Sequence, residues 1–209
     1  DDRPRSVGTA AAGADPGRII FGGDHLGTQV WRKEAAQTAM EKARALVAGY
    51  VTAGFGKIHL DCSEGCASEP AQLPDQITAE RSADLAVACL EASRAPETLS
   101  FVIGTEVPPP GGARVDEDGD IPATRPDAAR ATLEAHRAAF EARGIGAALD
   151  QVLGLVVQPG VEFSPMHVHH LPPDRDPGLR AVAETWPNLC LEAHSTDYQH
   201  DSTYPRLAE

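Results

Sequence analysis

The sequence predicts an α/β fold, namely an incomplete TIM (β/α)8 barrel with about five β/α units. Five short apolar runs alternate with helical or partly helical stretches, and each connection is long enough for a crossover between parallel strands. All five runs end in polar, glycine-bearing or proline-bearing segments. A doubly wound sheet concentrates its chemistry at one switch point, whereas a barrel spreads it over many strand ends, so the barrel is favoured.

The elements follow one another in a regular order. Strands are expected at 18–27, 57–63, 99–106, 152–158 and 189–194, with the first apolar run leading into Gly22-Gly-Asp-His25. Helices are expected at 33–52, 77–93 and 126–143, and a weaker one at 178–185. Residues 1–17 lack apolar periodicity and are predicted to be a disordered leader before one domain at 18–209. Five strands cannot close an eight-stranded barrel, so we expect either a fragment or a completing partner.

Composition excludes several classes of protein. The net charge of -13, with 18 basic against 31 acidic residues, argues against a nucleic-acid partner and favours a small molecule or a protein. No apolar run approaches the roughly 20 residues of a membrane helix. The scattered cysteines and the lack of a recognisable secretion signal predict a cytoplasmic protein without a disulfide framework.

Some candidate metal motifs have simpler explanations. Cys62 and Cys66 are spaced C-x3-C, but no second pair completes a four-ligand site. The acidic tip at 116–120 lacks the ligand spacing of a calcium loop. The three histidines in 166–170 lie between prolines and are interpreted as a solvated loop, and His136 is interpreted as a helix-face residue.

Polar groups at the strand ends form recognisable motifs. An acid beside an imidazole, Asp24-His25, ends the first run, and His59 and Asp61 share one face of the second. The five motifs are Phe21-Gly-Gly-Asp-His-Leu-Gly27, Lys57-Ile-His-Leu-Asp61, Val102-Ile-Gly-Thr-Glu-Val-Pro108, Val156-Val-Gln-Pro-Gly-Val-Glu-Phe163 and Glu192-Ala-His-Ser-Thr-Asp-Tyr-Gln199. Together they resemble the non-catalytic (Z) subunit family of D-tagatose-1,6-bisphosphate aldolase, which is class II aldolase-like and related to ketose 4-epimerases. By this resemblance the chain looks like barrel strands three to seven.

The resemblance implies a divalent metal, zinc or manganese, and a set of site residues. Asp24-His25 is similar to the Asp-His pair of class II aldolases, in which the histidine binds the metal and the aspartate exchanges a proton with the substrate. His194 is similar in placement to a second metal histidine, and Gln158 stands where a third is expected. Asp61 and Glu106 are the alternative bases, Glu106 and Glu162 are alternative metal ligands, and the expected substrate-binding residues are Gly23, His59, Glu162, Ser195 and Asp197.

Three functions stay open at this point. The first is an accessory subunit that stabilises a class II tagatose-bisphosphate aldolase in galactitol and N-acetylgalactosamine catabolism. The second is a metal-dependent ketose 4-epimerase or aldolase that uses retro-aldol chemistry, and the third is an inactive truncated barrel. The expected partners are a catalytic aldolase subunit or further copies of the chain, together with a sugar or sugar phosphate.

Overall fold

The main sheet has five parallel strands, which are consecutive in space as they are along the chain. The computed structural model describes residues 13, 15, 18–104, 121–172 and 178–207. Within these residues the sheet order is β1-β2-β3-β4-β7. The strands are β1 (Gly22–Leu26), β2 (Lys57–Leu60), β3 (Ser100–Ile103), β4 (Val152–Val157) and β7 (Cys190–Ala193). Because every pair is parallel, the carboxyl ends of all five strands lie at one edge.

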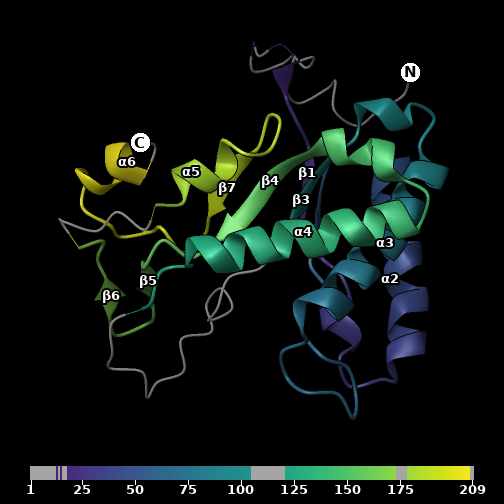
Figure 1. Cartoon of the computed structure of the whole chain (residues 1–209), viewed down its shortest axis with the longest axis horizontal. Helices are drawn as coiled ribbons and strands as arrows, with labels where there is room; N and C mark the ends of the chain where they lie inside the picture. The colour runs from purple at the N-terminus through teal and green to yellow at the C-terminus, as the bar shows by residue number, and fades with distance from the viewer. Residues whose placement is uncertain (1–12, 14, 16–17, 105–120, 173–177, 208–209) are drawn as a thin grey trace.

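Helices connect the strands and pack against the sheet (Figure 1). The long ones are α2 (Ala36–Thr52), α3 (Asp75–Ala92) and α4 (Pro126–Ala142), and α5 (Arg180–Ala183) is a single turn. Short 3-10 turns η2 (Gln29–Trp31), η3 (Pro96–Thr98) and η4 (Gly146–Gln151) precede α2, β3 and β4. The strand order does not reverse, so the predicted alternation of five parallel strands with helices is confirmed.

The two faces of the sheet have different compositions because side chains alternate along each strand. One face, with Ile58, Phe101 and Leu155, forms a continuous apolar core with the helices. On α4, the inner stripe contains Leu133, Phe140 and a fully buried His136, as the helical spacing predicts. The opposite face carries the polar side chains of β2 and β7, and the site described below lies on it.

Two boundaries differ from the sequence-based expectation. The first strand was expected over 18–27 with its apolar part before Gly22, but β1 comprises only Gly22–Leu26, and residues 19–21 precede it. The prediction relied on the apolar run at 18–21. In the structure, the glycine-bearing segment that follows forms the strand, because it is the segment that pairs with β2. The helices at 33–52 and 77–93 were placed correctly to within three residues at each end.

The C-terminal third contains elements that were not predicted. The loop at 166–170 is part of a hairpin in which β5 (Glu162–Phe163) pairs antiparallel with β6 (Val168–His169). A short helix, α6 (Thr203–Leu207), follows β7 where no closing element was expected. Two-residue strands and a five-residue helix are too short for a periodic signal in the sequence.

Several predictions fall on residues outside those that the structure describes. They include most of the leader at 1–17, Glu106 and the acidic tip at 116–120. In the described part of the chain, no helix combines the length and the apolar character needed to cross a bilayer. The described cysteines, Cys62, Cys66, Cys89 and Cys190, are all free thiols.

Candidate metal centre

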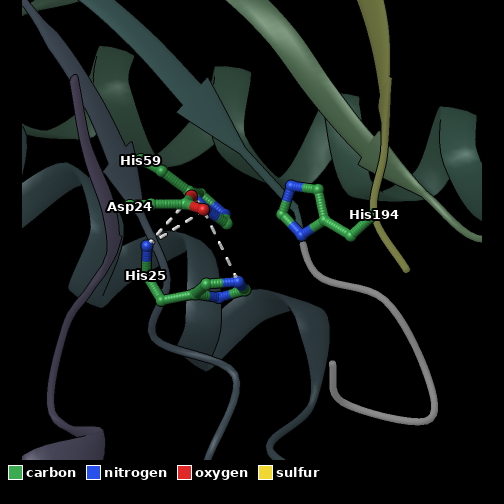
Figure 2. Close-up of side chains that lie close together, drawn as sticks. All are labelled: Asp24, His25, His59 and His194. Carbon is green, nitrogen blue, oxygen red and sulfur yellow. Dashed lines mark hydrogen bonds and ion pairs between the residues drawn. The ribbon is translucent and has the colours of Figure 1, made fainter. Parts of the chain in front are cut away.

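Four side chains from three strands converge at the carboxyl edge of the sheet (Figure 2). Asp24 and His25 belong to β1, His59 belongs to β2, and His194 directly follows β7. One ligand atom from each of them lies within 4.8 Å of the corresponding atoms of the others. The ring centroid of His25 is 4.9 Å from that of His59 and 5.1 Å from that of His194. We refer to these four residues as the metal cluster.

A β-bulge explains how two consecutive residues of β1 reach the same site. Gly23 pairs with Ile58 and Leu26 with Leu60, so β1 uses one residue more than β2 between these pairs. The extra residue lies in Asp24-His25, and His25 has a left-handed φ of 47°. In a regular strand these neighbours would point to opposite faces, whereas a bulge re-aims a side chain. The sequence motif therefore depends on a local backbone irregularity.

The ring of His25 is oriented by the carboxylate of Asp61. His25 Nδ1 lies 2.9 Å from Asp61 Oδ2, and Asp61 Oδ1 accepts hydrogen bonds from the backbone N–H and the hydroxyl of Ser63. Burial alone would raise the pKa of Asp61, but the hydrogen bonds from His25 and Ser63 outweigh it and lower this pKa. An ionised carboxylate only accepts, so His25 Nδ1 donates, and Nε2 of a neutral His25 carries the lone pair.

The ring of His59 is oriented by a backbone carbonyl. This side chain is fully buried, and its Nε2 donates to the carbonyl oxygen of Gly104, 3.1 Å away. Gly104 follows β3 directly and has a φ of 85°, a conformation that glycine adopts without strain. Because the carbonyl can only accept, Nδ1 of a neutral His59 carries the lone pair. The backbone N–H of His25, 3.3 Å away, donates to this atom.

His194 is oriented in the same way by Glu192, two residues earlier on β7. The distance from His194 Nε2 to Glu192 Oε1 is 3.0 Å, and Glu192 Oε2 lies 2.6 Å from Lys57 Nζ. The hydrogen bond from His194 and then that from Lys57 lower the pKa of Glu192 to about 2, against the effect of burial. Nε2 of His194 therefore donates, and Nδ1 carries the lone pair.

The donor set fits a divalent metal ion. Each of the three rings has one nitrogen held by an acceptor and the other able to coordinate, which is the usual arrangement of metal-binding histidines. Asp24 Oδ1 lies 2.8 Å from His59 Nδ1, the atom that carries the lone pair of a neutral His59 ring. An ionised carboxylate and an imidazole lone pair repel each other at this distance unless a proton or a metal ion is bound to them. The cluster could thus bind a metal through imidazole nitrogens and a carboxylate oxygen.

The structure places the other expected ligands differently. Gln158 is buried, and its Oε1, the atom able to bind a metal, accepts the backbone N–H groups of Gly160 and Val161. Gln158, which was expected to be a metal ligand, therefore holds the turn after β4. Glu162 is fully buried on β5, and its Oε1 accepts the N–H of Phe163.

The remaining expected residues fall in several environments. Gly23 does not face the cluster: a Cβ at this position would overlap Leu26 and Tyr50 on the side of α2, so the glycine allows close packing of helix and strand. Ser195, with a φ of 53°, follows His194, whereas Asp197 is exposed. Asp61 has both carboxylate oxygens engaged, which favours an orienting role over that of a base.

The sequence pattern gave His59 a role different from its place in the structure, and it gave Lys57 and Glu192 none. His59 was expected to bind substrate, but it lies inside the metal cluster. The parallel register of β1 and β2, which no local pattern specifies, brings it beside Asp24. Lys57 and Glu192 were given no role, although each lies two residues before a cluster histidine and hence on the same strand face. That spacing was the available signal.

The fold and the site define an α/β protein with a histidine and carboxylate cluster at the carboxyl edge of a parallel sheet. The chain belongs to the GatZ/KbaZ-like family, described as D-tagatose-1,6-bisphosphate aldolase subunit GatZ/KbaZ-like, which matches residues 6–209. It is similar to a crystal structure of a probable tagatose 6 phosphate kinase from Sinorhizobium meliloti 1021, with 38% sequence identity and a TM-score of 0.82. The match covers 96% of this chain and 47% of that chain, so this chain spans about half the length of its relative. The family resemblance inferred from the five motifs is confirmed.

Proposed function

We propose that this chain acts as part of an accessory subunit of a class II D-tagatose-1,6-bisphosphate aldolase in carbohydrate catabolism. The observation that carries this proposal is the match of the aldolase-subunit family over residues 6–209. The consecutive parallel strands support a partial (β/α)8 barrel, whose functional residues gather at the carboxyl ends of the strands. The proposed partners are the catalytic aldolase subunit or further copies of this chain.

A divalent metal ion, zinc or manganese, is proposed for the cluster. His25, His59 and His194 would hold it through nitrogen, and Asp24 through a carboxylate oxygen. When bound, such an ion polarises the carbonyl and hydroxyl oxygens of a ketose or its phosphate. Asp24 is the most exposed member, with 61% of its side chain accessible, so it is positioned to meet a substrate from solvent.

Reconstitution with a separate catalytic subunit tests the accessory role. The aldolase subunit is purified alone and with this chain, and its activity is followed during incubation at elevated temperature. We expect the two chains to co-purify and the catalytic subunit to lose activity more slowly in the mixture, because complex formation stabilises the folded state. A matched mixture with an unrelated acidic protein is the control. An unchanged inactivation rate without co-purification would contradict the accessory role.

The metal cluster favours a second candidate, in which the chain belongs to a metal-dependent ketose 4-epimerase or aldolase. Three histidines with fixed tautomers and a partly exposed carboxylate form a donor set suited to catalysis as well as to structure. In this reaction Asp24 would exchange a proton with the substrate hydroxyl, and the three histidines would hold the metal.

Direct assays separate the candidates. Tagatose and fructose, each with and without phosphate, are supplied together with zinc or manganese. Turnover that disappears in Asp24→Ala and His194→Ala chains, but persists in a His167→Ala chain, would support the enzyme. His167 is an exposed residue outside the metal cluster. Turnover unchanged by the first two substitutions would rule out the proposed centre, and inactivity in both assays would favour an inactive barrel.

A further inference from the structure

An ion pair crosses the polar face of the sheet below the metal cluster. Lys57 lies at the start of β2 and Glu192 lies on β7, and strands β3 and β4 stand between them. Even so, Lys57 Nζ is 2.6 Å from Glu192 Oε2. Strands that are not neighbours can join their side chains only across the face that they share, so this pair spans the interior side of the curved sheet.

The neighbouring backbone leaves room for this arrangement. Gly22 pairs with Lys57, and a Cβ at Gly22 would come within 3.3 Å of Lys57 Cδ. On the strands between, the same face carries Val102 and Val156, which are 2% and 3% exposed. Barrel interiors are usually filled by layers of branched apolar side chains. Packing alone does not explain why a lysine and a glutamate lie beside these valines.

Glu192 connects this ion pair to the cluster. One carboxylate oxygen, Oε2, accepts from Lys57, and the other, Oε1, accepts the Nε2 proton of His194 at 3.0 Å. Lys57 therefore fixes the rotamer of the Glu192 carboxylate. The carboxylate in turn fixes which nitrogen of His194 carries the lone pair.

We propose that Lys57 and Glu192 are positioning residues that orient His194 for metal binding, an inference that rests on the proposed metal site. Lys57 acts through Glu192, and Glu192 acts through His194. The Lys57 side chain is 39% exposed and that of Glu192 is 24% exposed, so solvent screens the pair and its loss alone changes stability little. A partner that orients a ligand nevertheless alters metal affinity about 10–100-fold when it is removed.

The chain supplies a matched control for this pair. Lys42 and Glu34 form an ion pair with the same 2.6 Å separation, and the Lys42 side chain is 44% exposed. Lys42 lies on α2, which packs against the other face of the sheet. Lys42→Met therefore removes the same charge and the same kind of contact without affecting Lys57, Glu192 or His194.

The test measures Co²⁺ and Zn²⁺ binding to the full chain and to its Lys57→Met, Lys57→Arg, Glu192→Gln and Lys42→Met variants. We expect Zn²⁺ affinity to fall about 10-fold in Lys57→Met and about 10–100-fold in Glu192→Gln. The visible absorption of bound Co²⁺ should change in both, because the orientation of one ligand changes. Lys57→Arg should recover most of the affinity, and Lys42→Met should match the wild type.

Each alternative outcome has a separate meaning. Wild-type affinity and Co²⁺ absorption in Lys57→Met and Glu192→Gln would overturn the positioning role while leaving the metal site intact. A wild-type chain that binds neither ion would overturn both the metal site and the positioning role of Lys57 and Glu192. If metal-free Lys57→Met melts well below Lys42→Met and Lys57→Arg does not restore affinity, the pair serves the fold, and the positioning role is wrong.

Discussion

Asp24 Oδ1 lies 2.8 Å from Nδ1 of His59, whose other nitrogen donates to the carbonyl of Gly104. With Nε2 committed as a donor, a neutral His59 presents the lone pair of Nδ1 to this carboxylate. The contact is favourable when a proton or a metal ion accompanies the two atoms. This contact joins strands β1 and β2 at the centre of the metal cluster.

Asp61→Asn should weaken metal binding although Asp61 is not a member of the metal cluster. The substitution replaces the carboxylate that orients His25 by a weaker, neutral acceptor. We expect the Zn²⁺ affinity, measured by chelator competition, to fall about 10-fold, at the lower end of the range for such partners. Glu64→Gln is the control, since Glu64 lies in the same loop and pairs with Arg32 on the surface. Equal losses in both variants would count against a specific role for Asp61.

Gly27→Ala should destabilise the fold, because its Cβ would overlap the carbonyl oxygen of Asp61 and separate the ends of β1 and β2. We expect a loss of about 1–3 kcal/mol, the usual cost of overpacking, in urea unfolding. Gly49→Ala is the matched control. Gly49 lies in α2 with open space around it, so alanine there should stabilise the chain by about 0.5–1 kcal/mol. A Gly27→Ala chain as stable as the wild type would show that this close approach is dispensable.

His136 should make stability fall in mild acid. Burial lowers the pKa of His136 from its ordinary value of 6.5, so below pH 6.5 the unfolded chain takes up a proton that the folded chain refuses. The contribution of the neutral His136 to the free energy of unfolding is therefore complete above pH 6.5, and it is lost as the pH falls from there towards the folded-state pKa. Each pH unit in this window costs at most about 1.4 kcal/mol. His136→Leu should have a flatter profile of unfolding free energy between pH 6.5 and 5. Parallel profiles for the two chains would refute this assignment.

Metal binding should raise the thermal stability of the chain. A ligand that binds only the folded state at about 100 times its Kd stabilises that state by about 2.7 kcal/mol. We expect a rise in Tm of several degrees with Zn²⁺ or Mn²⁺ in a thermal melt. His25→Ala should show no such rise, whereas Cys190→Ser, which alters an exposed thiol outside the metal cluster, should retain it. A similar rise in His25→Ala would indicate binding elsewhere.

Local patterns predicted the β/α alternation and much of the site. Helix α4 was placed within one residue because its apolar stripe and Pro126 at the first turn agree. Asp24 and His25 were identified as an acid beside an imidazole after an apolar run, and His194 through the resemblance to class II aldolases. The tertiary register was the missing information: the bulge of β1 and its pairing with β2 bring His59 beside Asp24. Gln158 was expected to bind the metal, and its side chain bonds locally to the turn of Gly160, a contact that the sequence pattern did not indicate.

Metal stoichiometry tests whether Asp24, His25, His59 and His194 together bind one divalent metal ion. The full chain and its His59→Ala and His167→Ala variants are equilibrated with Zn²⁺ or Mn²⁺, dialysed, and analysed for metal content. We expect about one ion per wild-type chain, the same for His167→Ala, and little or none for His59→Ala. Equal metal content in the wild type and His59→Ala, or none in the wild type, would contradict it.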